Sequence, residues 1–430
     1  MSGVHEWLAF GRVVVLWRAV LSPFVSESAL MASEASPVIW TAAPPKRGAM
    51  AFAGLFAVES FARSLIATVV SVQAHDLLRE SQRVSVLFTC VSIIVLTSTV
   101  VLFPFLFRKL PRRWAYTLGV GALITACIAF ATFTLPGQVF GMYLRNAGAA
   151  ILNISLSLYI LDHIRRADLV RSEPLRLTLS TLSWTVGPFL GVWLYERYGH
   201  WAPQALSIGV SFVLVALFWR LRLGDHPVIR AAKSVPQTPL KNIRRFIRQP
   251  RLRLAWLIAF GRSCFWSTFF IYGPLLMIEG KLGKEAGGLL ISAGNAVLCT
   301  AFLFGRLSER VGVRVVIAGA FAAAAAVSLG AGLAGVSAPV IAALFLLCGS
   351  IATCALDGVG GIPFLRAVRA YERPQMTAVY RTYIDFADLI PSFIYSFALL
   401  VFPLGIVFII LALGLLMIAL IAWVHLPRTM

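Results

Sequence analysis

The sequence predicts an all-α integral membrane protein with twelve transmembrane helices in two six-helix halves and both termini in the cytoplasm. Three observations support this prediction: the composition, the spacing of the apolar runs and the positions of the basic residues. Of the 430 residues, 59% are hydrophobic and only 13% are charged, and the mean hydropathy is +0.84. Because soluble domains carry about 25% charged residues, this composition is typical of a polytopic membrane protein.

Twelve apolar runs are long enough to cross a bilayer as helices, which takes about 20 residues each. The predicted spans cover residues 49–72, 84–107, 115–134, 138–161, 177–195, 202–222, 254–278, 286–305, 312–333, 338–364, 377–400 and 403–425.

Basic residues fall in every second connection between these runs. RKLPRR follows the second run, DHIRRADLVRSEPLR the fourth, GRLSERVGVR the eighth and RAVRAYER the tenth, whereas LPGQ and GVSAP carry none. The positive-inside rule therefore places both termini and every even-to-odd connection in the cytoplasm. The net charge of +20 is largely this topology signal, so we expect a lipid bilayer and not a nucleic acid as partner.

The connection at residues 223–253 divides the chain into an N-terminal half, residues 48–222, and a C-terminal half, residues 254–430. Residues 1–47 precede the first half. We interpret residues 1–30 as a misannotated upstream start or as a disordered surface segment, because their apolar centre is too short and too charged to span a membrane.

The connecting segment TPLKNIRRFIRQPRLR has the pattern of a basic amphipathic helix. Apolar residues share one helical face opposite the arginines: Leu240, Ile243, Phe246 and Ile247. The pattern predicts a helix on the inner leaflet, attracted by anionic lipid, or a solvated tether whose arginines only fix the topology.

Catalytic and metal-binding patterns are missing from the sequence. None of the six cysteines has CxxC or metal-ligand spacing, and no P-loop, HExxH, GxSxG or dinucleotide-binding motif is present. The sequence therefore predicts no enzyme, no cofactor and no metal site, and the energy for any transport would come from ion gradients.

The connection after the eighth run, GRLSERVGVR, resembles the loop signature G-x-L-x-D-R-x-G-x-R of the major facilitator superfamily. Five positions match, namely Gly305, Leu307, Arg310, Gly312 and Arg314, while Glu309 replaces the family's aspartate. The resemblance implies that the glycine permits close helix contact and that the acid and arginines form a latch across the cytoplasmic helix ends. The corresponding loop of the first half, FRKLPRRWAYTLG, keeps the basic residues without the acid or the signature glycines.

The fifth run contains TVGPFLGVW, in which Gly187, Pro188 and Gly191 resemble the GP-x-x-G core found in antiporter branches of this superfamily. An ordinary kinked packing helix is the alternative, because glycine and proline also serve close packing and bending. The family resemblance implies two halves that rock around a midplane site, with helices 1, 4, 7 and 10 lining the path.

Charges inside apolar runs cost a few kcal/mol each, so they normally face the bundle interior or water. Glu59 and Arg63 lie at i and i+4 in the first run and predict either a structural salt bridge or a carboxylate that alternates between arginine and a proton. Asp357 lies within the tenth run.

Two further arginines, Arg145 and Arg262, lie in the fourth and seventh runs. Each would attract an anionic substrate group or keep a carboxylate deprotonated, unless it only packs or pairs. Polar and aromatic groups expected at a substrate cavity are Asn153, Trp266, Tyr272 and Asn295.

The stretch RTYIDFADLIPS begins the eleventh run with Arg381, Asp385 and Asp388 at i, i+4 and i+7, which share one face of a helix. Arg381 is expected to pair with Asp385. Asp388 would lie near the bilayer centre, just before Pro391. Three interpretations are open for it: proton coupling, a gate pair with Arg262 or Arg145, or neither.

These features predict a secondary transporter that moves a small molecule by alternating access, coupled to protons and working as an export-type antiporter. A proton symporter importing a small, anionic solute is the alternative. A non-transporting membrane receptor or assembly factor on the same fold is the alternative from another class. We expect a monomer in a bacterial inner membrane.

Overall fold

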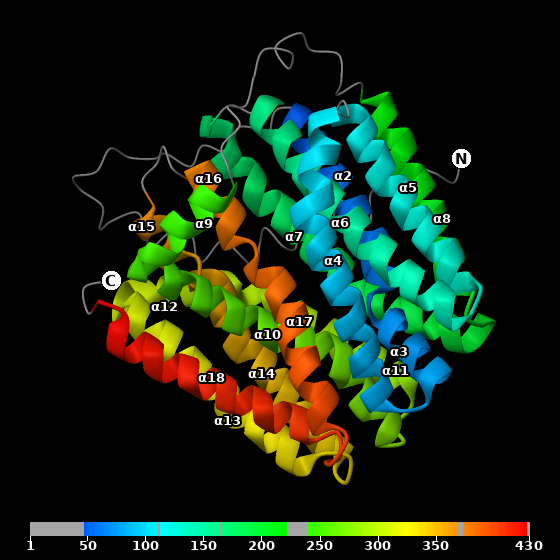
Figure 1. Cartoon of the computed structure of the whole chain (residues 1–430), viewed down its shortest axis with the longest axis vertical. Helices are drawn as coiled ribbons and strands as arrows, with labels where there is room; N and C mark the ends of the chain where they lie inside the picture. The colour runs from blue at the N-terminus through cyan, green and yellow to red at the C-terminus, as the bar shows by residue number, and fades with distance from the viewer. Residues whose placement is uncertain (1–46, 110–111, 164–165, 222–238, 369–372, 428–430) are drawn as a thin grey trace, which may run out of the picture. The chain divides into compact units, whose positions relative to one another are not determined.

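The computed structural model describes residues 47–109, 112–163, 166–221, 239–368 and 373–427, and these residues form helices without strands. The first helices are α2 (Arg47–Leu65), α3 (Ala67–Leu78), α4 (Ser81–Lys109), α5 (Arg112–Ala131), α6 (Leu135–His163), α7 (Arg166–Tyr198) and α8 (Ala202–Arg220). The later ones are α9 (Pro239–Arg248), α10 (Pro250–Glu279), α11 (Lys284–Ala296), the 3₁₀ helix η3 (Val297–Thr300), α12 (Ala301–Val311), α13 (Val313–Ala334), α14 (Pro339–Val359), α15 (Ile362–Ala367), α16 (Arg373–Tyr380), α17 (Tyr383–Ala398) and α18 (Ile406–His425) (Figure 1).

Helices follow the apolar runs because a chain in lipid must satisfy its backbone N–H and C=O groups internally. Several begin with proline in the first turn, as Pro203 does in α8, Pro250 in α10 and Pro339 in α14. Proline suits this position because its missing N–H would have no partner inside the helix.

Eight of the described helical segments are long and apolar enough to cross a membrane. Lys284–Thr300 and Leu303–Val311 would make a ninth if this pair, bent by 52°, is counted as one span. The all-helical, multi-pass membrane fold is thus confirmed. The count of twelve crossings and the cytoplasmic termini stay predictions.

All described residues belong to one compact unit, Lys46–Met430. The division into halves around the connection 223–253 stays a prediction, and residues 223–238 of that connection lie outside the described residues. The interpretation of residues 1–30 also lies outside them.

Close helix packing in the first part of the bundle depends on small residues where α2 meets α7. The Ser64 hydroxyl donates to the carbonyl oxygen of Ser183 at 2.9 Å. A Cβ atom at Gly191 would lie 1.8 Å from the carbonyl oxygen of Leu65, and one at Gly187 would lie 2.0 Å from the Ser64 hydroxyl. The two backbones therefore approach as closely as glycine allows.

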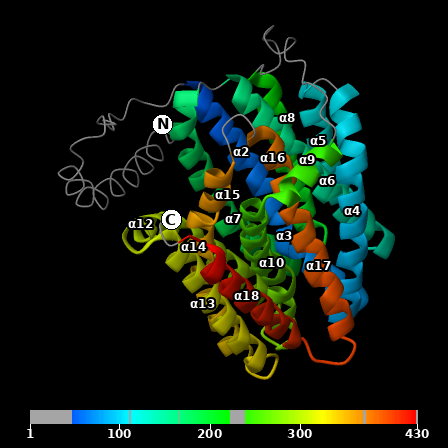
Figure 2. The same ribbon diagram turned by 60° about the vertical axis from the view of Figure 1, so that its left-hand side comes forward.

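Helices from the two predicted halves also pack against each other. In both views α4 lies beside α17 (Figures 1 and 2), and the two helices are in contact. Tyr272 of α10 is fully buried at this junction and shares a 2.7 Å hydrogen bond with Ser85 of α4. On another side α7 meets α11, where the Phe189 N–H donates to the Ser292 hydroxyl at 2.9 Å.

Candidate substrate and coupling site

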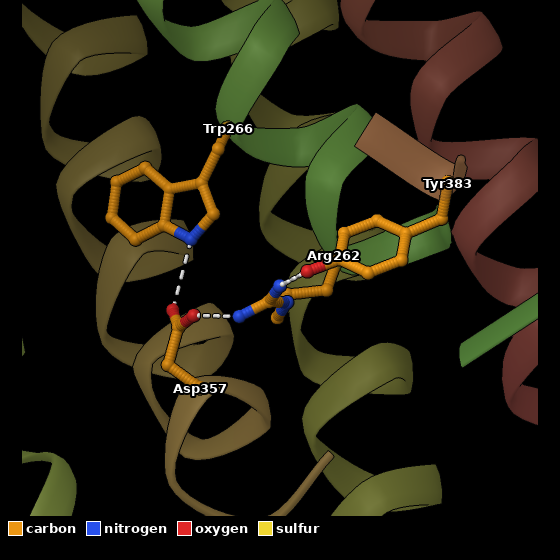
Figure 3. Close-up of polar contacts among 4 residues, drawn as sticks. All are labelled: Arg262, Trp266, Asp357 and Tyr383. Carbon is orange, nitrogen blue, oxygen red and sulfur yellow. Dashed lines mark hydrogen bonds and ion pairs between the residues drawn. The ribbon is translucent and has the colours of Figure 1, made fainter. Parts of the chain in front are cut away.

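Arg262, in the middle of α10, is the centre of a polar network that joins α10, α14 and α17. Its guanidinium forms an ion pair with Asp357 of α14 and donates to the Tyr383 hydroxyl of α17 at 3.0 Å. The indole N–H of Trp266 donates to the other carboxylate oxygen of Asp357 at 2.9 Å (Figure 3). Arg262 and Trp266 are i and i+4 on α10, so one helix face presents both groups to the same carboxylate.

In the present conformation Arg262 pairs with Asp357. From the sequence, Asp388 was the expected partner of Arg262 in one of the three interpretations. The side chains of Arg262 and Asp357 are 23% and 20% exposed, so the pair is reachable by water although it lies among packed helices. Arg262 also lies 5.6 Å from the centre of the Tyr383 ring, within the range of a cation–π contact.

Asp388 of α17 has different neighbours. Its carboxylate lies near the Ser267 side chain of α10 and within electrostatic range of Arg145 of α6. Arg145 and Asp388 come from the two predicted halves of the chain. Among the described residues the two side chains do not form an ion pair in this conformation, so the gate pair of Asp388 with Arg145 stays a prediction.

The guanidinium of Arg145 has fewer hydrogen-bond partners than that of Arg262. Its Nε–H has no hydrogen-bond partner among the described residues, and its closest polar contact is Asn146 Oδ1 at a marginal 3.5 Å. Arg63 repels it, whereas Asp388 attracts it. A guanidinium has five N–H donors, so Arg145 keeps donors available for a bound anion.

Glu59 and Arg63 form the i,i+4 ion pair that their spacing predicts. The Arg63 guanidinium lies 3.3 Å from the Glu59 carboxylate, and the Glu59 side chain is fully buried. In this conformation the pair is a salt bridge within α2. This agrees with the first of the two interpretations of the sequence, a structural salt bridge.

Arg381 does not continue the stripe of Asp385 and Asp388 as predicted. Helix α16 ends at Tyr380 and α17 begins at Tyr383, so Arg381 lies in the break between them and is exposed. The break is fixed by Thr382, whose hydroxyl donates to the Val379 carbonyl at 2.8 Å and accepts from the Trp256 indole at 3.1 Å. Arg381 still attracts the Asp385 carboxylate electrostatically.

Two of the four residues predicted for a substrate cavity are buried in the helix packing of this conformation. Tyr272 is fully buried against α4 and α17, and the Asn295 side chain, 3% exposed, donates to the Ile291 carbonyl of its own helix at 2.9 Å. Trp266 belongs to the Arg262 network, and Asn153 lies half-buried on α6. Whether such a side chain is buried depends on which side of its helix faces the bundle, and the polarity of a single residue does not reveal this.

The latch implied by GRLSERVGVR is not formed in the described part of the chain. Glu309 and Arg310 are exposed, as is Leu307, and Arg314 stacks at 4.5 Å over the ring of Trp423 on α18. Gly312 has φ of +90°, a conformation that favours glycine and ends α12.

The packing role expected for Gly305 is wrong for this conformation. A Cβ atom at Gly305 would meet nothing within 4 Å. The close approach of α14 to α12 occurs at Gly358, whose Cβ would lie 2.6 Å from the Ala301 carbonyl oxygen. In the GP-x-x-G pattern of α7, by contrast, Gly187 and Gly191 do lie at a close helix contact, and Pro188 packs at Gly288 of α11.

Sequence reasoning missed an ion cluster that joins α3, α7 and α11. The Lys284 ammonium lies 2.8 Å from Asp76 and 3.0 Å from Glu196, and the Tyr195 hydroxyl donates to Asp76 at 2.7 Å. Close by along the chain, Ser81 at the start of α4 donates to Glu279 at the end of α10. These residues flank apolar runs, but their pairing across about 200 positions of sequence carries no local signal.

The comparisons with known proteins agree with this architecture. A family model described as Major Facilitator Superfamily matches residues 175–392. No curated protein matches the chain in sequence.

Solved transporter structures share the fold. One is the nucleoside transporter NupG, at a TM-score of 0.70 and 12% identity, covering 88% of this chain and 99% of that chain. A POT family transporter in complex with a thioalcohol-conjugated peptide has a TM-score of 0.69 and 14% identity, over 88% of this chain and 96% of its own. A bacterial homologue of the iron transporter ferroportin, in an inward-facing state, has a TM-score of 0.60 and 15% identity, over 88% and 96%.

Proposed function

Because this chain belongs to the Major Facilitator Superfamily, we propose that it is a secondary transporter that moves a small molecule by alternating access and couples this movement to protons through Asp388. Family membership makes the chain a transporter and not an enzyme. The observation that carries the proposal is the Nε–H of Arg145 on α6, which has no hydrogen-bond partner among the described residues and lies within electrostatic range of Asp388 on α17.

The two arginines of the site, Arg145 and Arg262, have different roles in the proposed mechanism. Arg262 is held by Asp357 and Tyr383, so it fixes α10, α14 and α17 relative to one another. Arg145 keeps an unpartnered N–H and depends on Asp388 for charge balance. Arg145 is therefore the cation whose environment changes when Asp388 gains or loses a proton.

The coupling step follows from this charge balance. An ionised Asp388 attracts Arg145 and favours contact between the two halves. Protonation removes the negative charge, weakens that attraction and leaves the Arg145 donors open to another partner. Proton binding and the closure of the site are thereby linked, as gradient-driven transport requires.

Export by antiport is the direction we favour, because Gly187, Pro188 and Gly191 reproduce the core of the antiporter motif and lie where α7 packs against α2 and α11. The runner-up is proton symport of a small anionic solute, which Arg145 and Arg63 would attract. A receptor or assembly factor on the same fold would show no solute flux in isolation. The bacterial inner membrane, the monomer and the assignment of halves belong to this same proposal.

The Lys284 cluster is the closed gate of the proposed cycle. It ties α11 of the C-terminal half to α3 and α7 of the N-terminal half, at the end that the positive-inside rule places outside the cytoplasm. The latch residues Glu309 and Arg310 at the other end are exposed. Within this proposal, the present conformation is the state with the outer end closed.

Replacing Lys284 by methionine is expected to open the outer end. The substitution keeps the length of the side chain but removes the charge-assisted contacts to Asp76 and Glu196. Loss of about 1.5 kcal/mol of such bonding shifts the equilibrium roughly tenfold toward the outward-facing state. The measurement is the rate at which an impermeant maleimide labels Ala74→Cys, a fully buried position on α3, in a background without native cysteines.

The matched control is Arg83→Met, which removes a 2.8 Å ion pair to Glu80 at the same end without joining two halves. Labelling should rise in Lys284→Met and stay at the background rate in Arg83→Met. Equal rates in both variants would contradict the gate.

A further inference from the structure

Helix α9 is short, and one part of its apolar surface packs against the bundle while another part is exposed. Phe246 is 3% exposed and packs with Phe364 of α15 and Met376 of α16, so this residue fastens α9 to the bundle. Both views show α9 next to α16 (Figures 1 and 2). The helix therefore has a fixed place beside the described bundle and is more than a loose tether.

The rest of its apolar side is uncovered. Ile243 and Ile247 are i and i+4 on α9, so they lie next to each other, and they are 40% and 55% exposed. A helix of 10 residues is about 15 Å long and cannot cross a hydrocarbon core of about 30 Å. Two neighbouring isoleucines on such a helix fit shallow burial at a membrane interface.

Arginines lie beside this apolar strip. Arg244 and Arg248 on α9, and Arg251 and Arg253 in the first turn of α10, are all exposed. None of these four forms an ion pair with a carboxylate in the described ranges. Guanidinium groups bind phosphate oxygens through paired N–H donors, so the patch lacks a counter-charge that phosphodiesters could supply.

We propose that α9 and the first turn of α10 bind anionic phospholipid headgroups, with Ile243 and Ile247 in the acyl–headgroup boundary and the four arginines on the phosphates. Each arginine near an anionic membrane surface strengthens association about fivefold, so two of them account for roughly 25-fold. This inference stands on the surface chemistry alone and does not depend on the transported solute.

The test is hydrogen–deuterium exchange of the full-length protein in nanodiscs of phosphatidylcholine, with and without phosphatidylglycerol. Amides of residues 239–253 should exchange at least several-fold more slowly when the anionic lipid is present. Arg244→Gln with Arg248→Gln should strongly reduce this lipid effect, and lysine at both positions should largely keep it, since lysine preserves the charge. Arg79→Gln with Arg197→Gln, two exposed arginines near the Lys284 cluster, is the matched control and should leave it intact.

Three results would overturn the proposal. Exchange at α9 could be the same in both nanodiscs, or both glutamine pairs could lower it equally, which would indicate a general effect of net charge. Inorganic phosphate added to phosphatidylcholine nanodiscs could reproduce the protection, which would indicate an ion site and not a lipid site.

Discussion

Asp388→Asn is expected to reduce proton-driven transport to the level of protein-free vesicles while leaving solute exchange measurable. Asparagine has nearly the same shape as aspartate, so the fold should persist. It cannot carry a proton or balance the charge of Arg145. Exchange needs only the reorientation of the loaded protein, whereas net driven flux needs the proton step.

The measurement is gradient-driven flux and equilibrium exchange of the same solute in proteoliposomes. Asp385→Asn is the matched control, because it makes the same chemical change one turn away on the same helix. It should keep a substantial part of the driven flux. If both variants lose driven flux equally, the assignment of coupling to Asp388 fails.

Gly191→Ala is expected to destabilise the protein strongly. The new Cβ atom would lie 1.8 Å from the Leu65 carbonyl oxygen and 3.3 Å from Val69 Cγ2, and the closest obstacle is backbone that cannot rotate away. Helices α2 and α7 would have to separate, and overpacking of this kind costs about 1–3 kcal/mol. Alanine's better helix propensity, worth up to about 1 kcal/mol, offsets only part of this cost.

Thermal unfolding in detergent tests this, and a net loss of about 2 kcal/mol should lower the midpoint by roughly 2–4 °C. Gly209→Ala is the control, since this glycine lies within α8 with nothing within 4 Å of its Cβ position, and Gly305→Ala is a second control for the same reason. Both should be neutral or slightly stabilising. A Gly191→Ala protein as stable as Gly209→Ala would contradict the close packing of α2 and α7.

The helices were predictable because burial in lipid leaves few alternatives to a helix for an apolar run of this length. Their interruptions were not. The first run is broken at Ile66. The eleventh is broken at Arg381 and Thr382, where the Thr382 hydroxyl donates to the Val379 carbonyl. The same hydroxyl accepts from the indole of Trp256 on another helix, and such a bond leaves no trace in the local pattern.

The candidate site was predictable at the level of residues and not of pairs. The cost of intramembrane charge singled out Arg145, Arg262, Asp357 and Asp388. Which arginine pairs with which carboxylate depends on how the helices are rotated about their axes. Arg262 lies 95 positions from Asp357, so no local pattern indicates their pairing. The family resemblance inferred from GRLSERVGVR is confirmed, although the latch it implies is not formed in the described residues.

A glycine contact and an ion cluster show the same difference between what a local pattern predicts and what it does not. The GP-x-x-G pattern correctly marked a place where helices approach, because only glycine fits between α2 and α7. The cluster of Asp76, Glu196 and Lys284 went unnoticed, because charged residues beside short connections look like ordinary solvated ends until the helices are assembled.

Proton-coupled transport is best tested by recording proton movement in sealed proteoliposomes when a gradient of a candidate solute is applied. For the transported solute we expect protons to move against the solute, and we expect Asp388→Asn to stop this movement. Protons moving with the solute would make the protein a symporter. Silence across a broad panel of solutes, with the protein shown to be folded, would contradict proton-coupled transport and favour a receptor.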